Sequence, residues 1–249
     1  MRRSSTRHPG KSADGLALAS RVLYEDNHLL VVNKLSSEVV QGDKTGDTPL
    51  SEEVKAYIKH KYAKAGAVYL GVVHRIDRPV SGAVLFARTS KALSRLNTML
   101  KERRIHKKYL AVVQRHPPDD TGKLAHHLRK NEKQNKSYPV PEKTTAAKRA
   151  ELLYRVIGRS ERYTLLEVEL LTGRHHQIRA QLSAIGCPIK GDLKYGYDRP
   201  NENGSIHLHA HAISFVHPVS GLELDIQAPL PAGDPLWEVF SKQLKRSNK

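Results

Sequence analysis

The residues best suited to chemistry lie in a short polar segment around Asp77, between two apolar runs at residues 68–73 and 83–87. Arg75 and Arg78 place cationic side chains beside this carboxylate. In an extended segment successive side chains alternate, so Arg75 and Asp77 would project from the same face. A neighbouring guanidinium favours the charged form of a carboxylate, which suits a nucleophile or base better than a proton donor. A structural ion pair at the end of a strand explains the same pattern equally well.

A second polar segment, residues 172–179, combines a glycine turn with basic side chains at the expected start of a helix. Backbone N–H groups at a helix start bind anions, and Arg174 and His175 add positive charge there. The segment therefore suits phosphate binding or the support of a carboxylate. Arg179 borders an apolar stripe, so we expect its side chain to point toward the sheet and to need a partner. Asp77 is the candidate partner.

Three alternating histidines, His207, His209 and His211, would share one face of a strand. Such a face is one way to bind a metal ion, but ordinary strand alternation gives the same spacing, and carboxylate or cysteine partners are absent nearby in the sequence. The sequence has no Gly-x-x-x-x-Gly-Lys loop and no Gly-x-Gly-x-x-Gly motif, so nucleotide-driven chemistry is not expected. Ser81 lies outside any Gly-x-Ser-x-Gly elbow, which argues against a serine hydrolase.

The chain is strongly basic, because 42 Lys and Arg residues against 25 Asp and Glu residues give a net charge of +17. An excess of this size favours a polyanionic partner, with nucleic acid as the first candidate. The single cysteine, Cys187, excludes an intrachain disulfide and a multi-cysteine zinc site, and it fits a reducing, cytoplasmic compartment. No apolar run approaches the ~20 residues of a membrane span, so we expect no membrane partner.

The predicted strands and helices follow one another without the regular alternation of a doubly wound sheet. Capped amphipathic stretches predict helices that begin near Thr48 and Ser90. We expect a flexible basic tail over residues 1–20 and one domain over residues 21–249, with a mobile basic loop at residues 129–145. Strands are predicted at residues 22–24, 28–33, 68–76, 83–88, 108–113, 151–157, 162–171, 206–216 and 222–228.

In combination, these motifs resemble the RluA-type RNA pseudouridine synthases over about residues 21–230, in the order that this family shows. Any one motif alone would be a weak match, but the ordered set is specific. The central motifs are His74–Asp77 with Ser81 and Gly82, Lys108–Leu110, Gly173–Arg179, and Gly186–Asp192 with Tyr195 and Gly196. Tyr24–Asp26, Asn33, Lys34, Leu208–Ala210, His217 and Pro218 extend the match.

The resemblance implies an α+β fold: a bent, mixed, mainly antiparallel sheet flanked by helices, with an RNA-binding cleft across its centre. It also implies isomerisation of specific uridines to pseudouridine in ribosomal or transfer RNA, with no cofactor and no metal. Asp77 matches the family's catalytic aspartate, Tyr109 the active-site tyrosine that packs against the target base, and Arg179 the arginine that pairs with the aspartate. RNA contacts are expected from His74, Arg75, Arg78, Lys107, Lys108, Arg174 and His175.

The sequence departs from the family pattern at three places. Leu35–Ser37 stands where the family commonly has Pro-x-Gly, His175 where threonine is common, and Ala180 with Gln181 where Val-His is common. About 20 residues precede the match, too few for the S4-type domain of some relatives, so target selection is expected from the catalytic domain and its 129–145 loop. We expect a monomer that needs no protein partner. The main alternative is a non-catalytic RNA-binding or RNA-folding protein on the same scaffold.

Overall fold

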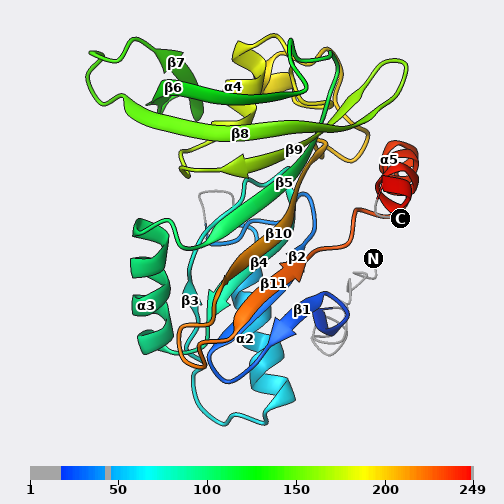
Figure 1. Ribbon diagram of the computed structural model, residues 1–249. Helices are drawn as coiled ribbons and strands as arrows, with labels where there is room; N and C mark the ends of the chain where they lie inside the picture. Colours follow the sequence, from blue (N-terminus) through cyan, green and yellow to red (C-terminus); the bar gives the residue numbers. More distant parts are fainter. Residues whose placement is uncertain (1–17, 43–45, 248–249) are drawn as a thin grey trace, which may run out of the picture.

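The computed structural model describes residues 18–42 and 46–247, which are built around one eleven-stranded sheet (Figure 1). The strand order is β1-β2-β4-β10-β5-β9-β8-β6-β7, with β3 paired to β4 and β11 paired to β10. The strands are β1 Val22–Glu25, β2 Leu29–Lys34, β3 Gly71–Val72, β4 Ser81–Ala87, β5 His106–Val113, β6 Thr121–Asn131, β7 Lys136–Val140, β8 Lys148–Arg159, β9 Thr164–Leu170, β10 Leu208–Val216 and β11 Glu223–Gln227. The helices are α2 Leu50–Lys61, α3 Ser90–Lys101, α4 Gln177–Ala184, the short 3-10 helix η1 Leu193–Tyr195, and α5 Pro235–Ser247.

Helices cover both faces of the sheet and divide the core between them. On the face that we call the front face, α2 and α4 pack against the strands, and Val54, Tyr109 and Ile178 belong to one apolar cluster. On the opposite face of β5, which we call the reverse face, α5 contributes Phe240 to a second cluster. Helix α3 contributes Leu96 to a third cluster, which includes residues of β4, β10 and β11. The predicted α+β class, a mixed and mainly antiparallel sheet flanked by helices, is therefore confirmed.

Strand β4 lies inside this arrangement, and all seven of its residues are buried. Its side chains alternate between two clusters, because Val84 and Phe86 belong to the front-face cluster while Ala83 and Leu85 belong to the cluster that includes Leu96. A strand covered on both faces has a continuous apolar sequence instead of an alternating one. This double coverage explains why residues 83–87 form an uninterrupted apolar run.

The two halves of the sheet meet where β4 and β10 run parallel, the only parallel pairing in the sheet as described. The parallel pairs are His209 with Ser81 and Ala210 with Gly82. Gly82 has a φ of 116°, and a Cβ atom at this position would overlap the backbone of Ala210. Glycine alone accepts both the conformation and the close approach. This junction directly follows the polar segment that contains Asp77.

Two predicted segments differ from the structure. Residues 68–76 form a strand only at Gly71 and Val72, because the polar segment turns back, with the N–H of Val80 donating to the carbonyl of Asp77 at 3.1 Å. Residues 129–145 are not one irregular loop, since they hold the end of β6, a turn and β7. Backbone hydrogen bonds between paired strands stabilise this hairpin, which a search for apolar periodicity does not detect.

Smaller differences concern the ends of the chain and of the helices. Thr89, not Ser90, caps α3, since its side chain accepts the N–H of Ala92, and α2 begins at Leu50, after Pro49. The predicted flexible tail over residues 1–20 lies almost entirely outside the described residues. Within residues 18–42 and 46–247, no helix combines the length and apolar character that crossing a membrane requires.

Candidate active site around Asp77

Asp77 lies in the turn between β3 and β4, and a buried lysine holds this turn in place. The ammonium of Lys34 donates to the carbonyls of Leu35 and Glu38, both at 2.8 Å, and of Arg78 at 3.1 Å. Its side chain is fully buried, and burial lowers the pKa of Lys34 to about 7. Three carbonyl dipoles offset part of the cost of burying this amine. The end of β2 is thereby tied to the residue that follows Asp77.

Arg179, on α4, links Asp77 to a second carboxylate. Its Nη1 donates to Oδ2 of Asp77 at 2.9 Å, while Nε and Nη2 donate to the two oxygens of Asp192 at 2.7 and 2.8 Å. Burial opposes the charge on this guanidinium, but the two carboxylates outweigh it and raise the pKa of Arg179. A bidentate pair of this kind fixes the orientation of the guanidinium as well as its charge. Arg179 is therefore a rigid donor to Asp77.

The sequence predicted the pairing of Asp77 with Arg179 but missed Asp192. That residue was noted only as part of a family motif, and its position 13 residues after Arg179 carries no helical or strand periodicity. Asp192 is almost completely buried, at 1 % side-chain exposure, just before η1. Its place directly after Gly191, within the family motif, is the sequence signal for it.

Both described contacts to the Asp77 carboxylate reach the same oxygen. Nη1 of Arg179 lies 2.9 Å and Nε2 of His176 lies 3.5 Å from Oδ2. The Asp77 side chain keeps 26 % of its surface exposed. Oδ1 is thus the oxygen available to an incoming ligand, while Oδ2 anchors the side chain. This is the geometry expected of a positioned nucleophile or base.

Tyr109 stands on β5, on the front face, close to this carboxylate. The side chain is buried, and burial, together with the negative charge of Asp77, raises the pKa of Tyr109. The phenol therefore keeps its proton at neutral pH. Its ring and hydroxyl can contact a ligand next to Asp77 without adding a charge.

The three basic residues that surround Asp77 in the sequence have different surroundings in the fold. The His74 ring points inward and accepts the N–H of Leu85 at 3.2 Å, and burial lowers the pKa of His74 to about 3. Arg75 is exposed, and Arg78 forms an ion pair with Asp47 at 2.6 Å. Residues 73–77 form no strand, so the predicted alternation of Arg75 and Asp77 along a strand is not what positions Asp77. Arg179 supplies the guanidinium instead, and RNA binding by these three residues remains a prediction.

Lys107 and Lys108 project from opposite faces of β5, because neighbouring strand residues alternate. Lys107 shares the front face with Tyr109, and its ammonium lies 3.7 Å from the point where a Cβ of Gly173 would be. Burial lowers the pKa of Lys107. In the described part of the chain, no carboxylate forms an ion pair with Lys107. Lys108 instead faces Glu167, at 3.8 Å, on the reverse face.

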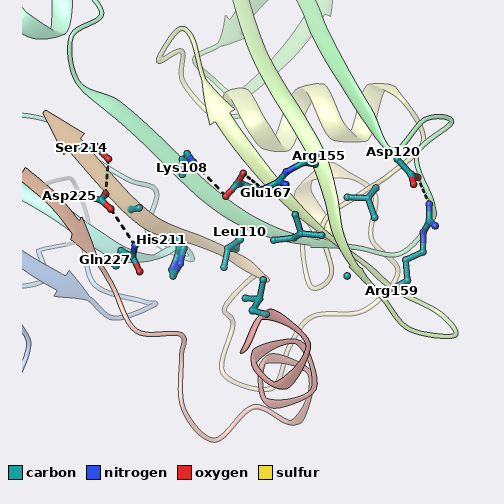
Figure 2. Close-up of a pocket in the computed structure, with 15 residues that line it drawn as sticks. Lys108, Leu110, Asp120, Arg155, Arg159, Glu167, His211, Ser214, Asp225 and Gln227 are labelled. Atoms are coloured by element: carbon teal, nitrogen blue, oxygen red, sulfur yellow. Dashed lines mark hydrogen bonds and ion pairs between the residues drawn. The ribbon is translucent and has the colours of Figure 1, made fainter. Parts of the chain in front are cut away.

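Figure 2 shows the reverse-face hollow that Lys108 borders, beside helix α5. Its volume is about 730 Å³, and Lys108, Arg155 and Glu167 lie along its wall. Arg155 is 3.1 Å from Glu167, so one carboxylate serves both cations. A second pair joins Asp120 and Arg159. The charges of this hollow are thus matched with one another.

Arg174 and His175, the two other predicted RNA contacts, lie just before α4. Arg174 is exposed and its Nε donates to the carbonyl of Arg149 at 2.9 Å. His175 contacts the β6–β7 hairpin, with Nδ1 2.9 Å from Oγ of Ser137 and Nε2 3.1 Å from Oδ1 of Asn135. The segment therefore connects the surroundings of Asp77 with the hairpin.

The alternating histidines differ in their shortest contacts, although His209 and His211 both lie near the carbonyl of Ala228. His207 pairs with Asp234 at 3.1 Å, His209 contacts Oγ of Ser81 at 2.8 Å, and His211 lies 3.1 Å from the carbonyl of Ala228. Across residues 18–42 and 46–247, no three His, Cys, Asp or Glu side chains are grouped as metal ligands would be.

Comparison with known sequences places these features in a family. The sequence model described as "RNA pseudouridylate synthase" matches residues 28–184, which include Asp77, Tyr109 and Arg179. The chain is 34 % identical over 213 residues to "Uncharacterized RNA pseudouridine synthase YlyB" of Bacillus subtilis, covering 84 % of this chain and 69 % of that protein. It is 35 % identical to "Ribosomal large subunit pseudouridine synthase C" of Escherichia coli, covering 87 % and 68 %, and 32 % identical to "Ribosomal large subunit pseudouridine synthase D" of Zymomonas mobilis, covering 92 % and 74 %.

Solved structures share the same fold. "Human RNA Pseudouridylate Synthase Domain Containing 4" aligns with a TM-score of 0.74 at 23 % identity, over 93 % of this chain and 94 % of the other. "Human RNA Pseudouridylate Synthase Domain Containing 1" aligns with a TM-score of 0.66 at 21 % identity, over 96 % and 98 %. The sequence matches show that this chain belongs to the RNA pseudouridylate synthase family, whose members are isomerases that act on RNA.

Proposed function

We propose that this enzyme isomerises a uridine of large-subunit ribosomal RNA to pseudouridine, with Asp77 as the reacting carboxylate. The observation that carries the proposal is the fixed orientation of Asp77, whose Oδ2 is held by Arg179 at 2.9 Å. Oδ1 is left to react. The choice of ribosomal RNA is supported by the names of the relatives from Escherichia coli and Zymomonas mobilis. Transfer RNA is the second substrate to test.

The proposed reaction exchanges one bond at C1′ of the target nucleotide for another. Oδ1 of Asp77 attacks C1′ as the bond from C1′ to N1 of uracil breaks. The detached base turns and bonds to C1′ through C5, while the bond to Asp77 breaks. C5 then loses its proton and N1 gains one, so that no net atom is added or lost. Abstraction of the C2′ proton by Asp77, giving a glycal, is the alternative first step and needs the same carboxylate.

Arg179 and Tyr109 have supporting roles in this proposal. Arg179 orients Asp77 and keeps its charge paired until attack. Tyr109 packs against the target base and, as a neutral phenol, can pass a proton at C5 or N1. The base must leave its stack to reach these groups, which costs a few kcal/mol.

RNA binding is proposed for the front face, where Lys107 has no ion-pair partner among the described residues and Arg75 is exposed. Lys107, Arg75 and Arg174 are the first contacts to phosphate, with His74, Arg78 and His175 around them. We leave Lys108 out of this set because its ammonium faces Glu167 on the reverse face. Phosphate contacts make affinity fall steeply with salt. That the enzyme acts as a monomer, without a cofactor or a protein partner, remains a prediction.

The hairpin β6–β7 is the further candidate for RNA contact, through exposed cations such as Arg129, Lys130 and Lys133. Removing the whole hairpin is a poor test, because the N–H of Ser137 donates to the Tyr195 hydroxyl and Leu128 is buried in the same small cluster. Substitutions of the exposed cations separate RNA binding from folding more cleanly than a deletion does.

Tritium release from RNA labelled at C5 of uracil tests the proposal directly, since the reaction removes the C5 proton. Unmodified large-subunit ribosomal RNA and a pool of unmodified transfer RNA serve as separate substrates. Asp77→Asn keeps the shape of the side chain and is expected to lower release at least ~10³-fold, the scale seen when a reacting group is removed. Asp225→Asn, an exposed carboxylate of the reverse-face hollow, is the matched control and should release tritium like the parent.

The outcomes separate the competing functions. Release by the parent and by Asp225→Asn, but not by Asp77→Asn, supports both the reaction and its carboxylate. Release by Asp77→Asn at the parent's rate would contradict the role of Asp77. Tight, salt-sensitive RNA binding without release from either substrate would favour the non-catalytic RNA-binding alternative.

A further inference from the structure

His176 lies beside the reacting carboxylate, and the proposed reaction assigns it no role. Its Nε2 is 3.5 Å from Oδ2 of Asp77, longer than a full hydrogen bond, and its side chain is only 7 % exposed. The residue adopts a left-handed backbone conformation, with φ of 52° and ψ of 29°, immediately before α4. A non-glycine residue in this region carries strain, which persists only where surrounding contacts determine the conformation.

The Tyr195 hydroxyl determines how the His176 ring is oriented. It accepts the backbone N–H of Ser137, on β7, at 2.9 Å, and it lies 3.0 Å from Nδ1 of His176. A hydroxyl has one proton to donate and can accept at the same time. The bond from Ser137 does not use the hydroxyl proton, so that proton can be donated to Nδ1.

The ring is neutral, so it carries one proton on one of its two nitrogens. Burial, together with the charge of Arg179, lowers the pKa of His176 to about 2. With Nδ1 accepting from Tyr195, the proton is on Nε2, and it points at Oδ2 of Asp77. The other tautomer would direct the Nε2 lone pair at a carboxylate oxygen, which is unfavourable. The geometry therefore selects the Nε2–H form.

We propose that His176 is a positioning residue for Asp77, held in the Nε2–H tautomer by Tyr195 and, through Ser137, by strand β7. This inference rests on the proposed function in taking Asp77 as the reacting group. Arg179 and His176 approach the same oxygen from α4 and from the residue before it. Together they fix the rotation of the carboxylate and direct Oδ1 toward the substrate. We expect the 3.5 Å contact to shorten when RNA occupies the site.

The hairpin and the carboxylate are consequently parts of one connected arrangement. The His175 ring stacks on that of His176, at 3.8 Å between centroids, and contacts Oγ of Ser137 at 2.9 Å. His175 therefore meets Ser137 directly, and His176 is linked to it through the Tyr195 hydroxyl. RNA that binds the hairpin would act on the orientation of Asp77 through these contacts.

Tyr195→Phe tests the proposal because it removes only the hydroxyl. The ring stays as packing for the Arg179 guanidinium, which lies 4.9 Å from its centroid. We expect kcat in the tritium-release assay to fall about 10- to 100-fold, as for a misplaced reacting group, with KM for RNA unchanged. The matched control is Tyr197→Phe, which deletes a hydroxyl two residues away that pairs with Tyr163 and not with His176. Its kcat should equal that of the parent.

Nitrogen-15 NMR of the histidine rings provides a readout that is independent of activity. The signal missing in His176→Gln identifies the ring, which should show protonated Nε2 in the parent and in Tyr197→Phe. In Tyr195→Phe the tautomer population should shift toward Nδ1–H. A parent ring protonated at Nδ1, or an unchanged kcat in Tyr195→Phe, would overturn the proposal. A parent that releases no tritium while its ring is the Nε2–H tautomer would count against the proposed reaction and leave the assigned geometry supported.

Discussion

Charged side chains from several elements gather on both sides of strand β5, but they pair in different ways on the two sides. On the front face, Arg179 and Asp192 are 6 % and 1 % exposed and meet in a bidentate pair. In the reverse-face hollow, Arg155 and Glu167 are 61 % and 24 % exposed, and Lys108 shares the same carboxylate (Figure 2). The front-face pair is a fixed structural element, whereas the reverse-face pairs face solvent.

This difference shows which charges are available for chemistry. A solvent-exposed pair contributes about 0–1 kcal/mol and rearranges easily, so it neither builds a site nor holds a group in one orientation. A buried pair is costly to form, and it keeps its geometry because each partner lacks an alternative. On the front face, Arg179 transmits that rigidity to Asp77. A hollow is therefore not the best guide to the reacting groups in this molecule.

The largest expected effect comes from breaking the buried pair. Asp192→Asn removes one charge and leaves Arg179 with Asp77 alone, so we expect the free energy of unfolding to fall by about 3 kcal/mol. Urea denaturation followed by circular dichroism measures this change. Asp77→Asn is the comparison variant; since Asp77 is 26 % exposed, its loss should be about 1 kcal/mol or less. Equal stability of the two variants would mean that the buried Arg179–Asp192 pair contributes no more than a partly exposed one.

The pairing of Asp77 with Arg179 could be predicted, whereas its full geometry could not. Arg179 borders Ile178 and Leu182 on one helix face, so its burial and its need for a partner follow from local periodicity. The bridge to Asp192 depends on where a loop returns to α4, and no local pattern encodes that return. His176 was missed for a related reason, because its conformation and its contact with Tyr195 arise only once η1 and β7 are in place.

The fold shows the same limit. Strands with apolar character, such as β4 and β9, were predicted within a few residues of their ends. The hairpin β6–β7 was predicted as a loop because most of its residues are exposed and give no apolar pattern. Backbone hydrogen bonds between the two strands stabilise it instead. Strand β5 begins at His106 and not at 108, so the alternation of Lys107 and Lys108 about the sheet could not be read from the predicted strand.

These two lysines provide the next test of the comparison, with a smaller effect. Lys107→Gln removes a front-face cation that no described carboxylate pairs, and we expect RNA affinity to fall by about 1 kcal/mol, with the salt dependence reduced by about one phosphate contact. Lys108→Gln differs by one position but lies on the reverse face, so its affinity and salt dependence should match the parent. Binding of ribosomal RNA fragments over a series of salt concentrations measures both. Equal losses would place RNA on both faces.

The smallest expected effect is a gain, produced by removing the carboxylate that the reverse-face cations share. Glu167→Gln leaves Lys108 and Arg155 without their partner, and stability should change by less than about 1 kcal/mol because the pairs are exposed. The freed cations should attract RNA without sequence preference, so that binding at low salt tightens a few-fold and its salt dependence steepens. Turnover should not rise, because RNA bound to the reverse face does not reach Asp77. If tritium release rose together with binding, the reverse face would be part of the productive path, and the separation between the two faces would not hold.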